Sequence, residues 1–130
     1  MTFTIEIEPR SPFGTDRDER LADAESLAKE IAQLDGVEKT ECFEKVQKGL
    51  DVFENPVVVA AAIHAGGAIV REFLKGFFQL LREKRQKGTY EAFSLHIHNN
   101  YFHLADDTAA SVEAEIEKMV EDALRKRENK

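Results

Sequence analysis

Disulfide bonds and targeting signals are the first features that this 130-residue chain lacks. It has a single cysteine, Cys42, so no disulfide can form within the chain. That usage suits a reducing compartment. The opening segment MTFTIEIEPR carries acidic residues where a secretory signal peptide would carry basic ones, and no long apolar segment follows it. We therefore expect a cytoplasmic protein.

An excess of positive charge is also missing. The formal net charge is −7, so most of the surface should repel a phosphate backbone. The one basic cluster comprises Arg82, Lys84, Arg85 and Lys87, and it falls where we expect a helix to end. Cations in a last helical turn complement the helix dipole, which is the simpler explanation for this cluster. We expect no nucleic-acid partner.

The longest uncharged run is too short for a membrane span. It extends from Val57 to Val70 and stops at Arg71, whereas a span needs about 20 apolar residues. VVVAAAI followed by HAGG could instead be a buried strand and a glycine turn, as in a nucleotide-binding fold, but neither nucleotide-binding glycine motif is present. We therefore predict one long helix from about Pro56 to Arg85. Gly66 and Gly67 then lie inside it, at a point of close packing.

The other segments give clearer signals. Thr2 to Glu8 alternates like a half-buried strand, and a helix capped by Thr15 or Asp16 runs to Asp35-Gly36. Residues 37–46 fit either an edge strand or a short helical turn, and Gln47 to Asn55 reads as a connection. A hairpin spans Phe93 to Ala105, and a last helix starts after Asp107 or Thr108. Arg125 to Lys130 forms a charged tail that we expect to fray.

This order of elements predicts a single α+β domain covering residues 1–130. Helices on one face of a small, mostly antiparallel sheet would bury their apolar stripes and leave the other face open. The expected architecture is thus a two-layer sandwich.

The hairpin gives the most specific prediction of a site. With a two-residue turn at Asn99-Asn100, His96 would lie directly opposite His103. The face turned away from the core would then carry Ser94, His96, His98, Tyr101 and His103. The three histidines and Tyr101 are our candidates for a binding surface.

These histidines allow two interpretations. Close together on one face of the hairpin, His96, His98 and His103 could hold Zn²⁺, with an open position for water or for Glu6. They could equally be tolerated polar residues of an exposed sheet face, or pack in a subunit interface. His-x-His alone is a weak metal signal, so we expect no cofactor and keep zinc as the alternative.

A catalytic set is not evident. Cys42 stands between charged residues with no flanking signature of a nucleophile, and His64 falls in the uncharged half of the predicted helix, where a buried, hydrogen-bonded imidazole is usual. No acidic pair is singled out as acid and base. We expect a protein that is not an enzyme.

Three segments together resemble a known family. VVVAAAIHAGGAIVREFLKGFFQLLREKR, the hairpin FSLHIHNNYFHLA and the helix SVEAEIEKMVEDAL resemble the effector-associated constant component family of bacterial conflict systems, over roughly residues 56–124. The resemblance is a pattern of residue types without a catalytic motif, and the more acidic N-terminal half departs from it. It implies a small α+β accessory domain that couples to an effector.

These observations favour an adaptor that contacts a protein partner or a second copy of itself. The alternative is a metal-binding or small-ligand protein that uses the three histidines. A third hypothesis, peripheral membrane binding through the Phe-rich part of the long helix, conflicts with the need for Phe73, Phe77 and Phe78 in the core.

Overall fold

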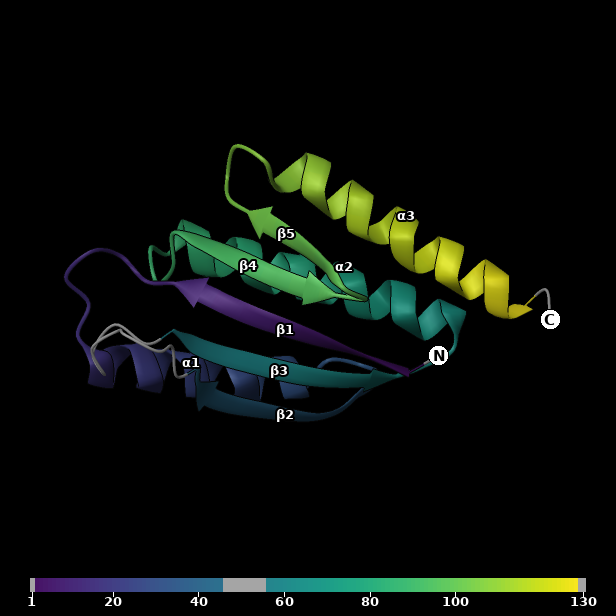
Figure 1. The fold of residues 1–130 in the computed structure, drawn as a ribbon. Helices are drawn as coiled ribbons and strands as arrows, with labels where there is room; N and C mark the ends of the chain where they lie inside the picture. Colours follow the sequence, from purple (N-terminus) through teal and green to yellow (C-terminus); the bar gives the residue numbers. More distant parts are fainter. Residues whose placement is uncertain (1, 46–55, 129–130) are drawn as a thin grey trace.

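The computed structural model describes residues 2–45 and 56–128. The described residues form strands and helices whose arrangement Figure 1 shows. Their bounds in chain order are β1 (Thr2–Arg10), α1 (Arg17–Ala32), β2 (Val37–Glu44), β3 (Val57–His64), α2 (Gly67–Gln86), β4 (Ala92–Ile97), β5 (Asn100–Leu104) and α3 (Ala109–Glu128). The predicted connection Gln47 to Asn55 lies outside the described residues.

The strands form one antiparallel sheet in the order β2-β3-β1-β4-β5. The two strands joined through α1, β1 and β2, are separated in the sheet by β3. The two strands joined through α2, β3 and β4, are likewise separated by β1. The first six elements therefore have the ferredoxin-like β-α-β-β-α-β topology, and β5 with α3 extends it at one edge.

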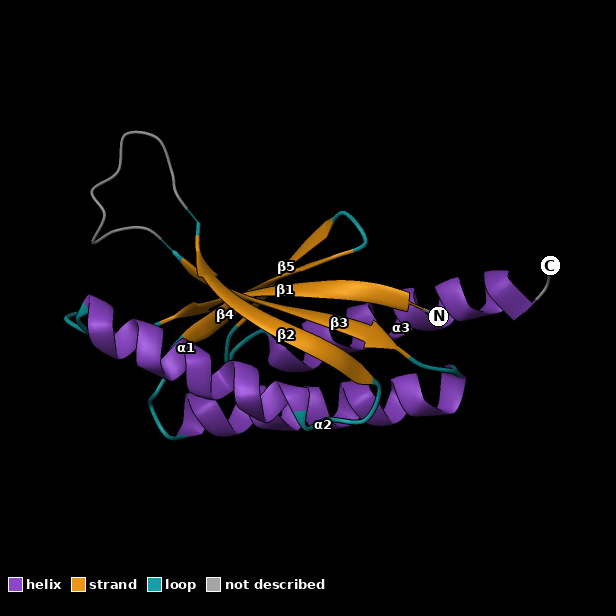
Figure 2. Cartoon of the chain, turned by 90° about the horizontal axis from the view of Figure 1, so that it is seen from below, coloured by secondary structure: helices purple, strands orange, loops and turns teal. Residues whose placement is uncertain are grey.

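All three helices cover the same face of the sheet (Figure 2). On β1 the residues alternate strictly, with Phe3, Ile5 and Ile7 buried beneath the helices and their neighbours exposed. Phe73 and Phe77 of α2 stack with ring centroids 5.4 Å apart in this core. The predicted two-layer α+β architecture is confirmed, and no helix in residues 2–45 and 56–128 covers the opposite face of the sheet.

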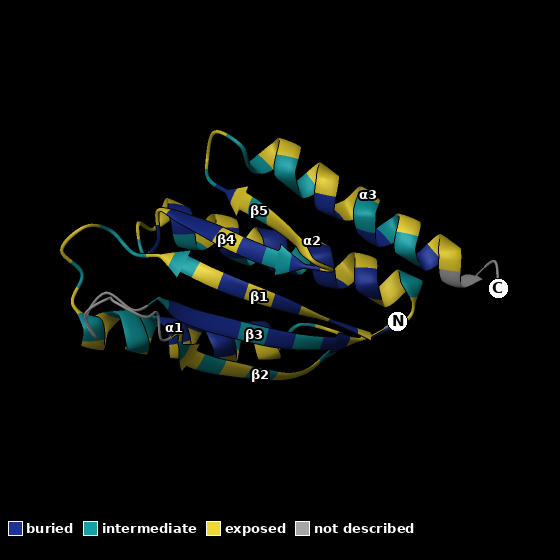
Figure 3. Cartoon of the chain, in the orientation of Figure 1, coloured by how far each residue is buried: buried dark blue, intermediate teal, exposed yellow. Residues whose placement is uncertain are grey.

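The prediction of one helix from Pro56 to Arg85 is wrong. Val57–His64 is strand β3, paired with β1 on one side and β2 on the other, and α2 begins only at Gly67. Figure 3 shows β3 as the most continuously buried strand of the sheet. A strand with neighbours on both sides can be apolar on both of its faces, so its sequence does not alternate between apolar and polar residues. Without that alternation, the run was taken for part of a helix.

The predicted packing role of Gly66 and Gly67 is also wrong. Gly66 is the N-cap of α2, and nothing lies within 4 Å of the position where its Cβ would be. Gly67 is the first helical residue. Gly36, with φ of +87°, is in close contact instead, because an added Cβ would lie 3.1 Å from Cβ of Ala65.

The remaining elements follow the sequence more closely. Asp16 caps α1 by accepting a 2.8 Å hydrogen bond from the Glu19 amide, and residues 37–44 form the edge strand β2. Helix α3 continues through the predicted charged tail as far as Glu128. No helix in residues 2–45 and 56–128 is long and apolar enough to cross a membrane.

Candidate interaction face on the open side of the sheet

The β4–β5 hairpin turns one residue earlier than the sequence suggested. Its two turn residues are His98 and Asn99, both with positive φ (49° and 65°), as a two-residue hairpin of type I′ requires. Asn100 instead pairs with Ile97, and its side-chain amide donates to the carbonyl of His98 over 3.0 Å. His98, Asn99 and Asn100 all tolerate positive φ, so the sequence did not show which two of them form the turn.

The altered turn moves the pairing by two residues. His96 now lies opposite Tyr101, and Ser94 opposite His103, so the predicted pairing of His96 with His103 is wrong. A shift by two keeps every side chain on its face of the sheet. His96, Tyr101 and His103 are therefore on the open face, as expected.

One row of side chains crosses the open face from edge to edge. Its members are cross-strand neighbours from all five strands, in the order Glu41, Ala60, Glu6, His96 and Tyr101. The rings of His96 and Tyr101 stack with centroids 4.3 Å apart and planes 4° from parallel. The Tyr101 ring system nevertheless remains open to solvent, since the residue is 77% exposed.

The carboxylate of Glu6 lies beside His96 in this row. Glu6 Oε2 lies 3.7 Å from Nδ1 of His96, close enough for an ion pair when the imidazole is protonated. Both side chains are partly exposed, so the pair is screened by water in the isolated protein. Exclusion of that water by a partner would strengthen the interaction.

Small apolar residues occupy the middle of the open face. Val58, Ala60 and Ala62 on β3 point away from the helices, because they alternate with Val57, Val59, Ala61 and Ile63 of the core. Val58 also lines a small hollow of about 50 Å³ beside Glu8, Lys45 and Tyr101. Sequence reasoning missed these residues because it assigned them to a helix, although the β-branched run and the following HAGG indicated a strand and a turn.

His98 does not belong to this face. Its ring packs against the core residue Phe3 with centroids 5.7 Å apart, and it lines a surface hollow together with residues of α3. The turn geometry explains the difference, because a residue at positive φ leaves the strand's alternation.

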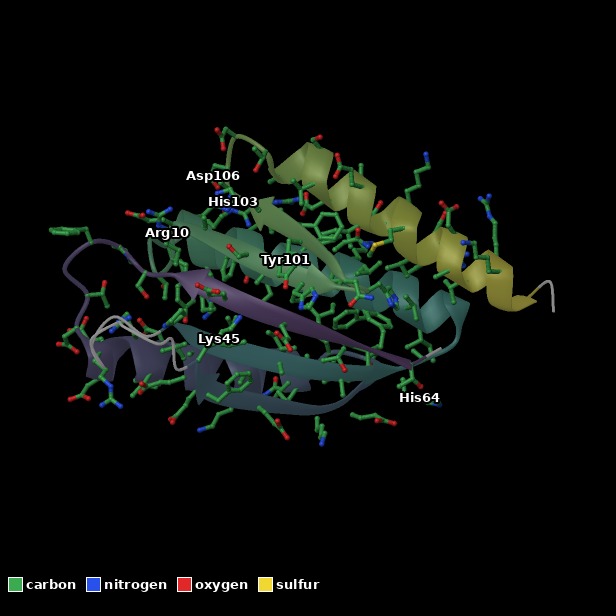
Figure 4. All side chains as sticks on the ribbon, in the orientation of Figure 1. Arg10, Lys45, His64, Tyr101, His103 and Asp106 are labelled. Carbon is green, nitrogen blue, oxygen red and sulfur yellow. The ribbon has the colours of Figure 1, made fainter. Side chains whose placement is uncertain are left out.

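Figure 4 also places His64 at the far end of the sheet from His103. His64 is exposed at the end of β3, where its Nδ1 lies 2.6 Å from the Thr2 hydroxyl.

The register bears directly on the metal alternative. His96 is stacked on Tyr101, His103 is opposite Ser94, and His98 faces α3, so the three imidazoles do not converge. Within the part of the chain that the structure describes, no three His, Cys, Asp or Glu side chains could hold a metal ion. The predicted triad therefore has no geometric support.

Cys42 is partly buried on β2. Burial, and to a smaller extent the carboxylate of Glu25, raises the pKa of its thiol. The thiolate is the nucleophilic form, so these surroundings lower the reactivity of Cys42 at neutral pH.

Comparison with known proteins gives no further assignment: no protein-family model matches the chain, and no curated protein is significantly similar to it.

Proposed function

We propose that the protein is a non-enzymatic interaction domain that binds a protein partner through the open face of its sheet. The observation that carries this proposal is the row ending in His96 and Tyr101. It presents a 77% exposed aromatic ring, stacked on a neighbouring ring, on the face that none of the described helices covers. Tyrosines fixed in this way are typical anchors of protein interfaces.

The composition of the face favours a protein over a nucleic acid. Sheets that bind single-stranded RNA stack bases on aromatic side chains within a positive surface. Here the outward residues of the central strand β1 comprise two threonines, two carboxylates and one guanidinium group, and its neighbour β3 presents alanines. In chain order they are Thr2, Thr4, Glu6, Glu8 and Arg10. Small side chains lose little conformational entropy when a partner covers them, whereas the carboxylates suit a partner that carries basic groups.

The resemblance to the effector-associated constant component family indicates which partner to seek. It implies an effector of a bacterial conflict system, to which this chain would be an accessory in the cytoplasm. Assembly into a homo-oligomer through the same face is the second outcome that the experiment must distinguish.

Site-specific photo-crosslinking tests the proposal. Benzoylphenylalanine replaces Tyr101 in the source cells, and a matched variant carries it at Gln79, which is exposed on α2. We expect one discrete adduct from position 101 and none from position 79. Mass spectrometry identifies the adduct as an effector or a second copy.

The identified partner is then purified and titrated calorimetrically. Tyr101→Ala should weaken binding by about 30-fold or more, as for an interface anchor, and Gln79→Ala should leave it unchanged. Equal yields at both positions, or equal affinity of Tyr101→Ala and the unmodified protein, would reject this function.

A further inference from the structure

A cleft of about 660 Å³ lies at the end of the sheet where β1 leads into α1. This volume is within the range of small-molecule sites. The cleft gathers residues that are far apart in the sequence, among them Arg10, Arg20, Tyr90, Phe93 and His103. Figure 4 shows Arg10 and His103 at this same end of the sheet.

The cleft has the opposite charge to the rest of the protein. Of the described residues that line it, Arg10 and Arg20 carry guanidinium groups and Glu8 carries a carboxylate, whereas the whole chain carries −7. Arg10 is exposed and makes no ion pair with any described residue. A positive hollow in a negative protein concentrates anions locally.

Apolar groups form the other part of the wall. Tyr90 and Phe93 line the cleft with rings in edge-to-face contact, 5.3 Å between centroids, and both residues are at most 2% exposed. The accessible apolar residues of the lining include Pro9, Pro12 and Phe13. A ligand with an apolar body would therefore contact these three side chains.

The rim that carries Arg10 is held in one conformation. The carbonyl of Arg10 accepts a 2.8 Å hydrogen bond from the Glu91 amide, which ties the end of β1 to the start of β4. The carbonyl of Pro12 accepts both from the Thr15 amide at 3.1 Å and from its hydroxyl at 2.7 Å. Such preorganisation lowers the entropic cost of binding.

We propose that this cleft binds a small organic anion. Arg10 takes the carboxylate or phosphate group, for which the planar guanidinium offers paired donors, and the apolar body rests against Pro9, Pro12 and Phe13. The cleft shares Ser94 and His103 with the open face but not Tyr101, so substitutions at Arg10 and Tyr101 distinguish this proposal from the contact with a protein partner.

Amide-resolved NMR titration of the full chain tests the proposal, with benzoate and phenyl phosphate as probes. Both should give saturable shifts around Arg10, Ser94 and His103 at low-millimolar concentration. Benzyl alcohol, which keeps the ring without the charge, should bind at least about tenfold more weakly, the factor expected for one lost charge-assisted contact. Inorganic phosphate, which keeps the charge without the ring, should also bind at least about tenfold more weakly, because it loses the apolar contact. The tighter of the two organic probes then distinguishes a carboxylate ligand from a phosphate ligand.

Three variants complete the test. Arg10→Gln should weaken both probes about tenfold. Lys39→Gln, which makes the same charge change on the distant edge strand β2, and Tyr101→Ala should have no effect. Absence of saturation, equal binding of benzyl alcohol, or unchanged binding by a folded Arg10→Gln variant would overturn the proposal without affecting that for the open face.

Discussion

His96 and Tyr101 are cross-strand neighbours whose rings stack 4.3 Å apart on the open side of the sheet. Aromatic cross-strand pairs stabilise a sheet by about 0.5–1 kcal/mol beyond the area that they bury. Here the tyrosine is 77% exposed, so the pair stabilises the fold weakly while it fixes the orientation of the ring. That combination suits a binding anchor better than a core element.

A double-mutant cycle measures this coupling. His96→Ala, Tyr101→Ala and the double variant should give a coupling energy of about 0.5 kcal/mol in urea unfolding, with no single substitution costing more than about 1 kcal/mol. Ser94 and His103 form the matched control, since they are directly paired on the same face without a stacked ring. Equal coupling in the two cycles would contradict the importance of the stack.

The hairpin turn is tested by two glycine substitutions. Asn99 has φ of 65°, so Asn99→Gly should raise the free energy of unfolding by about 0.5 kcal/mol. Asn100 is a strand residue that bonds the His98 carbonyl, so Asn100→Gly should lower it by about 1 kcal/mol. Stabilisation by both substitutions would instead favour a turn at Asn99-Asn100.

These two features illustrate how far the sequence could be interpreted. Alternation in Phe3, Ile5 and Ile7 was enough to place β1, and Asp16 and Gly36 were enough to bound α1. Val57 to Ile63 is apolar on both sides, because its outward residues lie in the middle of a sheet, so its periodicity did not distinguish strand from helix. The β-branched residues and the HAGG segment were the features that indicated a strand followed by a turn.

The cleft was beyond sequence reasoning for a different reason. Arg10, Arg20, Phe93 and His103 belong to four different elements, and only the strand order brings them together. The open-face site was partly predictable, because cross-strand periodicity placed His96, Tyr101 and His103 on one side without the exact register. His98 could not be placed, since its position depends on which residues make the turn.

Alkaline pH should destabilise the fold through Tyr90. Burial, with smaller contributions from Asp23, Cys42 and Glu30, raises the pKa of its hydroxyl above the ordinary value of about 10. The folded state then retains a proton that the unfolded state loses, so the free energy of unfolding falls as pH rises above about 10. Below that pH the contribution of Tyr90 is constant.

Tyr90→Phe should reduce the loss of stability at alkaline pH. The hydroxyl of Tyr90 is buried without a hydrogen-bond partner among the described residues, so its removal should leave stability at pH 7 unchanged or raise it by about 1 kcal/mol. Unfolding by urea from pH 7 to 11 provides the measurement, and Tyr101→Phe, at the chain's other tyrosine, is the control. Identical pH profiles for the unmodified protein and Tyr90→Phe would contradict the assignment.

Alanine substitutions at two glycines distinguish the stability cost of backbone strain from that of close contact. Gly14 and Gly36 have nearly the same positive φ, +92° and +87°, but nothing lies within 4 Å of a Cβ built at Gly14. A Cβ at Gly36 would lie 3.1 Å from Ala65 Cβ and 3.2 Å from Ile69 Cγ2. Gly14→Ala should cost about 1 kcal/mol, the penalty for an L-residue in this region.

Gly36→Ala should lower the free energy of unfolding by about 1–2 kcal/mol more than Gly14→Ala does. The reason is that the Cβ of Ala65 is attached to the backbone that leads into α2 and cannot rotate away. Urea unfolding of the two variants side by side gives the difference. Equal losses would mean that the segment joining β3 to α2 yields by a few tenths of an ångström at no cost. An excess at Gly36 would instead establish that the end of α1 and the start of α2 are held in contact through this position, which fixes how the two helices sit on the sheet.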